Sequence, residues 1–113
     1  MSQITTHVLD TSIGKPAAGI AVQLEKPIGG GQWQTLGKGQ TNADGRIADL
    51  LSTGVKLSPG TYRLVFDTGA YFARHKCKAF YPSVTIIFET TDELHYHVPL
   101  LLNPYGYSTY RGS

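Results

Sequence analysis

The sequence predicts an all-β domain, a two-sheet β-sandwich of seven or eight short strands with one short helix. Two observations lead to this fold class. Thirteen glycines and six prolines are spread along the 113 residues and divide the chain into short segments, as turns do in all-β domains. Within several segments, large apolar residues alternate with other residues, a period-two pattern that places them on one face of a sheet.

The alternation locates the strands in order along the chain. It is clear in five segments, which are residues 4–9, 20–25, 61–67, 83–89 and 95–101. Three weaker candidates are residues 33–40, 45–51 and 105–111. Turns are expected where glycine, proline, asparagine or aspartate gather between strands, at 13–18, 27–32, 42–45 and 58–60. Short strands and turns at this spacing are typical of a β-sandwich.

Residues 69–79 differ from the rest because they lack alternation and are rich in Ala, Lys, Arg and aromatic residues. We expect one short helix there, ended near Pro82 because proline does not continue a helix. The segment contains the single cysteine, Cys77, so no internal disulfide can form. We expect this thiol to be buried, since free cysteine is among the most buried residue types.

Length and composition limit the class of protein. We expect one domain, residues 1–113, with the globular composition of 41% hydrophobic and 16% charged residues. The net charge of +2 and the absence of any run of like charge argue against a nucleic-acid partner. The apolar runs are far shorter than the roughly 20 residues that span a membrane. The first residues lack a secretory signal, and together with the single cysteine this leads us to expect a cytoplasmic protein.

The predicted strand at 95–101 has an unusual outer face. His95, His97, Pro99 and Leu101 share that face, which is partly apolar. If the alternate residues point into the core, this face points outward, and its apolar side chains would be more stable when shielded from water. We expect the cover to be another subunit, because an outward face with apolar content marks an interface.

The histidines allow two kinds of chemistry. His95 and His97, with His7 as a third ligand, have a spacing that can support a zinc site. No Cys or Glu stands at ligand spacing beside them, however, and histidine is also the usual proton acceptor near neutral pH. We therefore expect no metal and no cofactor.

The segment 42–46, Asn-Ala-Asp-Gly-Arg, is partly similar to a calcium-binding loop. Gln40 and Leu51 occupy the first and twelfth positions, where an EF-hand needs an oxygen ligand and Glu. An Asp-Gly turn between strands accounts for the segment except for Arg46. That guanidinium is either solvated surface charge or a group that binds a carbonyl or an anion.

The last ten residues, 104–113, contain three tyrosines and an arginine and have β-propensity. Terminal segments are more often small, polar and disordered. The segment is therefore either a last edge strand or a chain end that docks into a site.

Four motifs together carry a resemblance to a known family. They are His7-Val8-Leu9-Asp10, Thr41-Asn42-Ala43-Asp44-Gly45-Arg46, His95-Tyr96-His97-Val98-Pro99-Leu100-Leu101-Leu102 and Tyr110-Arg111-Gly112-Ser113. These motifs resemble the 5-hydroxyisourate hydrolases, the transthyretin-like enzymes of urate degradation. The terminal motif separates these enzymes from transthyretin, the hormone carrier with the same fold. The resemblance implies a transthyretin-like sandwich and a homotetramer, a dimer of dimers with active sites in a channel between the dimers.

The resemblance also implies roles for individual residues. It makes His7, Arg46 and His97 catalytic, with Arg46 also binding the substrate, and leaves His95 as structural or supporting. It implies substrate binding by the terminal motif, which consists of Tyr110, Arg111, Gly112 and Ser113.

The implied reaction is hydrolysis of a cyclic amide in the six-membered ring of 5-hydroxyisourate, which gives 2-oxo-4-hydroxy-4-carboxy-5-ureidoimidazoline. No Ser or Cys nucleophile with a triad is visible, so we expect direct attack by water that the pair His7 and His97 deprotonates. Arg46 would bind the planar ring and stabilise the developing oxyanion. Tyr110 and Ser113 would position the substrate by hydrogen bonds, and the Ser113 carboxylate would orient a histidine.

Two other classes of function remain open. A transthyretin-like carrier would use the same channel for a hydrophobic ligand, and a structural sandwich domain would serve protein contacts. A carrier has no need of the polar set His7, Arg46 and His97 with the terminal motif, and a structural domain has no use for a docked terminus rich in tyrosine. The sequence therefore favours the enzyme.

Overall fold

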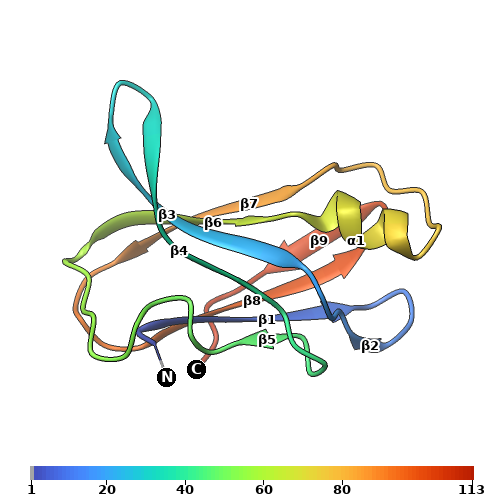
Figure 1. Ribbon diagram of the computed structural model, residues 1–113, viewed down its shortest axis with the longest axis horizontal. Helices are drawn as coiled ribbons and strands as arrows, with labels where there is room; N and C mark the ends of the chain where they lie inside the picture. Colours follow the sequence, from blue (N-terminus) through green and yellow to red (C-terminus); the bar gives the residue numbers. More distant parts are fainter. Residues whose placement is uncertain (1) are drawn as a thin grey trace.

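Two β-sheets lie face to face in the computed structural model, which describes residues 2–113 (Figure 1). One sheet has the strand order β2-β1-β8-β9, with β5 paired to β1, and the other has the order β4-β3-β6-β7. The elements are β1 (Ile4–Asp10), β2 (Lys15–Pro16), β3 (Ala21–Gly29), β4 (Gln32–Gln40), β5 (Arg46–Ile47), β6 (Gly60–Phe66), α1 (Thr68–Arg74), β7 (Val84–Thr90), β8 (Tyr96–Asn103) and β9 (Gly106–Thr109). The predicted two-sheet sandwich with one helix is confirmed, and the strand count is higher because the two-residue strand β2 lies where a turn was predicted.

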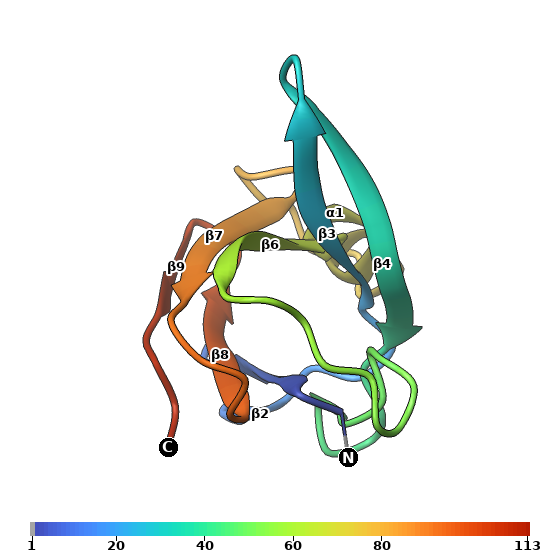
Figure 2. The same ribbon diagram turned by 90° about the vertical axis from the view of Figure 1, so that its left-hand side faces the viewer.

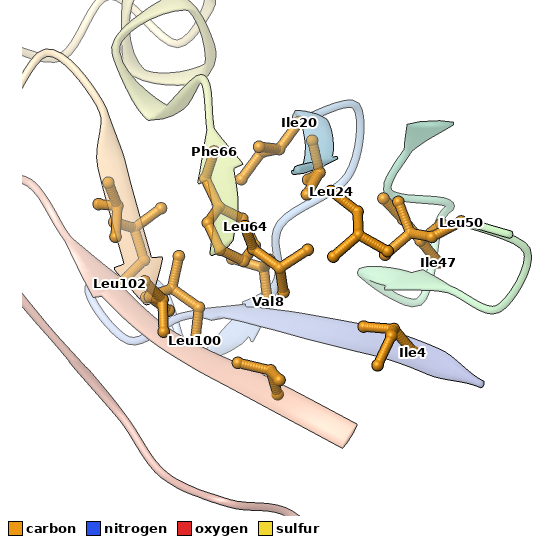
Figure 3. Packing of buried hydrophobic residues seen from close by; sticks show 14 of the residues in the cluster. Ile4, Val8, Ile20, Leu24, Ile47, Leu50, Leu64, Phe66, Leu100 and Leu102 are labelled. Atoms are coloured by element: carbon orange, nitrogen blue, oxygen red, sulfur yellow. The ribbon is translucent and has the colours of Figure 1, made fainter. Parts of the chain in front are cut away.

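The core lies between the two layers, which Figure 2 shows end-on, with β3, β4, β6 and β7 above β8 and β2. The inward faces that alternation predicted are buried: Val8 from β1, Leu64 and Phe66 from β6, and Leu100 from β8 have no exposed surface. Figure 3 shows these side chains meeting between the sheets. Burial of one such side chain stabilises the fold by about 1.5–3 kcal/mol.

Strand β1 determines where the outward residues of its sheet lie. It pairs in parallel with β8, so that Thr5 is in register with His97 and His7 with Pro99. It also pairs with β5 in antiparallel fashion, which places Arg46 directly opposite His7. Residues from three separate parts of the chain therefore meet on one face of one sheet.

The turn before β5 is built as the sequence predicts. The side-chain oxygen Oδ1 of Asn42 accepts hydrogen bonds from the backbone N–H groups of Asp44 (2.9 Å) and Arg46 (3.0 Å). Gly45 has a φ of 74°, and a Cβ there would lie 2.4 Å from the carbonyl oxygen of Val8. Only glycine satisfies both the backbone conformation and the close approach to β1.

The predicted strand at 45–51 is wrong in its length, because only Arg46–Ile47 pairs with β1. After this pair the chain leaves the sheet, and the side chains of Leu50 and Leu51 enter the core from a loop. This loop crosses β4 so closely that a Cβ on Gly37 would lie 1.8 Å from the carbonyl oxygen of Leu50.

The hairpin of β3 and β4 projects from the top of the molecule in Figure 1. Its strand β3 is longer than the predicted 20–25, since pairing with β4 continues to Gly29. The predicted turn at 27–32 is present but shorter, confined to the tip of the hairpin between Gly29 and Gln32, where Gly29, Gly30 and Gly31 all have positive φ.

The predicted helix is present, but its predicted C-terminal end is wrong. Helix α1 ends at Arg74 because Lys76 adopts a left-handed conformation, with a φ of 53°. The N–H of Cys77 donates to the carbonyl of Phe72 (2.9 Å), and that of Lys76 donates to the carbonyl of Ala73 (3.0 Å). This pair of bonds is the Schellman arrangement that closes a helix, so Pro82 has no part in ending it.

The early end of the helix also explains a second error. Cys77 is exposed rather than buried, because it follows the helix in a run of exposed residues, 73–78. Within the described part of the chain, no helix is long and apolar enough to span a bilayer.

Candidate active site

The three catalytic candidates lie together on the outer face of the β1–β8 sheet. His7 and His97 have nearly parallel rings, with centroids 6.4 Å apart and an interplanar angle of 23°. Arg46 is held opposite His7 by the pairing of β5 with β1. Arg46, His95, His97 and Ser113 line a pocket of about 270 Å³. The pocket therefore offers the imidazoles of His95 and His97 and one guanidinium to a ligand of small size, and the His7 ring stacks beside His97.

The surroundings of both imidazoles favour the neutral form. Burial lowers the pKa of His97 below its ordinary value of 6.5, and the positive charge of Arg46 lowers it further, with smaller effects of His7 and His95. Burial also lowers the pKa of His7, followed by the charge of Arg46, while the carboxylate of Asp44 opposes the shift. At neutral pH the two rings are therefore able to accept a proton.

Sequence reasoning missed Thr5, a pocket residue whose side chain contacts two histidines. Its hydroxyl Oγ1 lies 2.8 Å from Nδ1 of His97 and 2.8 Å from Nε2 of His95. These contacts fix the His97 ring and leave its Nε2 as the nitrogen available to a ligand. The alternation of β1 puts Thr5 on the same face as His7, and this was the one signal in the sequence.

The histidines do not form a metal centre among residues 2–113, where no group of three His, Cys, Asp or Glu side chains lies close enough to hold an ion. The Thr5 hydroxyl lies between the two histidines of β8. The three-histidine zinc arrangement that the spacing allowed is therefore not formed.

The C-terminal segment fulfils both alternatives, because Gly106–Thr109 forms the edge strand β9 and the residues that follow it dock against β8. The N–H of Gly112 donates to the carbonyl of His97 (2.9 Å), and the hydroxyl of Thr109 donates to the carbonyl of Pro99 (2.7 Å). Pro99 is buried as a result. The prediction that another subunit covers this face is thus wrong for Pro99, which its own chain covers, whereas His95 is exposed.

Glycine is required at position 112 because the segment passes directly over the His97 ring. A Cβ at Gly112 would lie 2.7 Å from Cδ2 of His97 and 3.2 Å from Cγ of Pro99. Gly112→Ala is expected to cost about 1–3 kcal/mol of unfolding free energy, since atoms must shift to relieve the overlap. The same substitution is expected to change the NMR chemical shifts of the His97 imidazole.

The matched control for this substitution is Gly106→Ala in the same terminal segment. A Cβ there would meet only Asn103, at an ordinary contact distance of 3.7 Å. This variant is expected to stay within about 0.5 kcal/mol of wild type and to leave the His97 signals in place. Equal effects of the two substitutions in chemical denaturation would contradict the close approach at Gly112.

Two residues of the terminal motif lie in an adjoining hollow rather than in the histidine pocket. Tyr110 and Arg111 line a space of about 270 Å³ between β7 and β8, which His97 also borders. The guanidinium carbon of Arg111 lies 4.7 Å from the ring centroid of Tyr96, a cation–π contact. The terminal motif therefore spans two neighbouring hollows, with Ser113 in the pocket and Tyr110 and Arg111 beside it.

Comparison with known sequences identifies relatives over nearly the full chain. The 5-hydroxyisourate hydrolase of Halalkalibacterium halodurans is 49% identical over 117 residues, covering 98% of this chain and 98% of that protein. The uric acid degradation bifunctional protein TTL of Arabidopsis thaliana is 46% identical over 123 residues. That match covers 97% of this chain but 37% of the plant protein.

Solved structures agree with these relatives. The 5-hydroxyisourate hydrolase of Klebsiella pneumoniae has a TM-score of 0.85 at 42% identity, covering 97% of this chain and 98% of that chain. Transthyretin from Sparus aurata has a TM-score of 0.90 at 29% identity, covering 99% and 97%. The predicted transthyretin-like fold is confirmed. The sequence profile of the HIUase/Transthyretin family matches residues 4–112, and the chain belongs to that family.

Proposed function

We propose that this chain hydrolyses 5-hydroxyisourate to 2-oxo-4-hydroxy-4-carboxy-5-ureidoimidazoline, a step of urate degradation. The observation that carries the proposal is the meeting of residues from three strands. Arg46 and His97 line one pocket, and His7 lies opposite Arg46 with its ring 6.4 Å from that of His97. It is supported by relatives named 5-hydroxyisourate hydrolase, including one 49% identical over nearly the whole of both chains.

Amide hydrolysis needs an activated water, a group that stabilises the carbonyl oxygen and a proton for the leaving nitrogen. In the proposed mechanism a neutral imidazole of the pair His7 and His97 takes a proton from water as its oxygen attacks the ring carbonyl carbon. The guanidinium of Arg46 binds the oxyanion that forms. The carbon–nitrogen bond then breaks, and the imidazolium returns its proton to the leaving nitrogen.

The terminal motif completes the proposed substrate site. Ser113 lines the histidine pocket and is assigned to hydrogen bonding with the substrate. Tyr110 and Arg111, which line the adjoining hollow, are assigned to binding the far edge of the substrate. Gly112 joins the two parts and allows the close passage over His97.

The proposed activity is tested by following ring opening directly. Urate oxidase acting on ¹³C-labelled urate generates fresh 5-hydroxyisourate, and the new carboxylate of the product has its own NMR signal. Faster growth of this signal with the protein than without it supports the hydrolase. Growth at the spontaneous rate, with folded protein, overturns it.

A carrier function is the second candidate, because the likeness to Sparus aurata transthyretin reaches a TM-score of 0.90. A carrier would bind a hydrophobic ligand without converting it. The polar pair His97 and Arg46 in the pocket argues against this, since neither serves an apolar ligand. Tight binding of an iodinated aromatic acid together with a spontaneous rate of ring opening would favour the carrier.

We also propose a homotetramer, a dimer of dimers in which the histidine pockets lie between dimers. The edge strands β7 and β9 expose large apolar side chains, Ile87 (61%) and Tyr107 (42%), and such exposed edges invite pairing with a second copy. Sedimentation velocity is expected to give four times the chain mass of 12.3 kDa. A species of one or two chains at micromolar concentration would contradict the tetramer.

We further propose that residues 1–113 act as one domain and that the protein works in the cytoplasm. The support for the compartment is the exposed thiol of Cys77, since a reducing environment keeps such a group unmodified.

A further inference from the structure

The hydroxyl of Thr5 joins two histidines that stand two residues apart on β8. Its Oγ1 lies 2.8 Å from Nε2 of His95 and 2.8 Å from Nδ1 of His97. Thr5 is almost fully buried, with 5% of its surface exposed, whereas His95 is exposed to solvent. The bridge thus runs from the half-buried ring in the pocket to a ring at the surface.

The number of available hydrogens limits how the two hydrogen bonds of the bridge can form. Each of the two contacts needs one hydrogen, and the Thr5 hydroxyl supplies only one. One of the two neutral rings must therefore supply the other. If His97 donates from Nδ1, the hydroxyl donates to His95 and Nε2 of His97 keeps a free lone pair. If His95 donates from Nε2, the hydroxyl donates to His97, whose proton then sits on its own Nε2.

We propose that Thr5 and His95 are positioning residues that act through His97, by a hydroxyl bridge that ties the tautomer of His97 to that of His95. The proposal rests on the proposed hydrolysis, in which His97 exchanges protons with water and the leaving nitrogen. With the lone pair on Nε2 the ring serves as a base, and with the proton on Nε2 it serves as an acid.

The bridge allows one ring to change between these two states within a single reaction. When Nε2 of His97 takes a proton from water, the Nδ1 proton passes to Thr5 Oγ1 and the hydroxyl proton passes to Nε2 of His95. His97 is then neutral with its proton on Nε2, and the positive charge is on His95. The reverse shift follows when Nε2 gives its proton to the leaving nitrogen, and every proton returns to its starting atom.

The charges around His97 favour such a transfer. His7 on β1, Arg46 on β5 and His95 on β8 are the titratable or charged groups that act on His97, and Asp44 acts on His7. A positive charge on His97 is close to the guanidinium of Arg46, whereas His95 is exposed and water can solvate its charge. Moving the positive charge from His97 to His95 therefore reduces its repulsion with the guanidinium of Arg46.

Kinetics of three single variants test the bridge. Thr5→Val keeps the shape and removes the hydroxyl, and it is expected to lower kcat about 10- to 100-fold with little change in KM, as for a lost hydrogen bond to a charged group. Thr5→Ser is expected to restore most of the rate. Thr11→Val is the control, because its hydroxyl donates only to the backbone carbonyl of Leu102, and it is expected to match wild type.

A double variant separates a shared bridge from two independent effects. His95→Phe is expected to lower kcat as Thr5→Val does. The kcat of the double variant is expected to equal that of the less active single variant. Since His95 is exposed, its replacement leaves the core intact. Additive losses, or a Thr5→Val rate within about twofold of wild type, would overturn the proposal.

NMR of the imidazole nitrogens tests the bridge without relying on activity. In wild type the ¹⁵N shifts of His97 are expected to show one dominant tautomer, and in Thr5→Val a mixture of both. If the wild-type protein does not speed hydrolysis but Thr5→Val still changes the His97 tautomers, the proposed function is wrong and the coupling of the tautomers stands. An unchanged His97 spectrum in Thr5→Val would remove the bridge itself.

Discussion

Replacing His97 by alanine is expected to slow the hydrolysis of 5-hydroxyisourate by about 100- to 10,000-fold, the usual effect of removing a general base. The His97 ring lines the pocket and contacts the Thr5 hydroxyl, and the backbone carbonyl of the same residue accepts a hydrogen bond from the terminal segment. Its side chain is half-buried on the outer face of β8 and lies outside the core, so the fold is expected to remain. Initial rates and thermal unfolding of the same preparation measure both effects.

The control for this substitution is His75→Ala. That ring contacts the carbonyl of Tyr71 at the end of α1 and belongs to neither hollow. Its removal is expected to leave the rate unchanged. If His97→Ala retains near-normal turnover, the assignment of His97 to the proton transfer is wrong.

Replacing Arg46 by alanine is expected to cost about 100- to 1,000-fold in kcat, comparable with the loss of an oxyanion donor. A second effect follows from charge. The guanidinium lowers the pKa of both His7 and His97, so its removal raises both values. Because the neutral ring is the active base, the acid limb of the kcat/KM profile lies below pH 6.5 in wild type and moves to higher pH in the variant.

Arg46→Lys separates the two effects. Lysine keeps the positive charge but lacks the planar pair of donors. We expect this variant to lose rate like alanine while its pH profile stays near that of wild type. A rate equal to wild type would show that the planar donors are not needed, and an alanine variant with an unmoved acid limb would contradict the charge effect.

The parts of the fold that follow from local rules were predictable from the sequence. Alternation identified the inward faces of β1, β6 and β8, because a strand with one buried face has a period of two. The turn at 42–46 was predictable since Asn42 bonds its own backbone and Gly45 takes a positive φ. Together these place Arg46 at the start of a strand, and the structure adds that this strand pairs with β1.

The remaining features depend on contacts between distant residues or on local strain. Lys76 ends the helix in a conformation that a lysine rarely adopts, and no residue pattern signals it. Thr5 meets His95 and His97 only because β1 and β8 pair in parallel, which joins positions about ninety residues apart. The burial of Pro99 by the terminal segment is likewise a contact that no local pattern encodes.

The most direct test of the proposed hydrolysis is a stopped-flow absorbance trace of freshly generated 5-hydroxyisourate, with and without the wild-type protein. The rate constant of decay is expected to rise in proportion to the protein concentration, and the product is expected to be the ring-opened ureidoimidazoline. Decay at the spontaneous rate at every concentration of folded protein would contradict the proposal that His7, Arg46 and His97 form a hydrolase site.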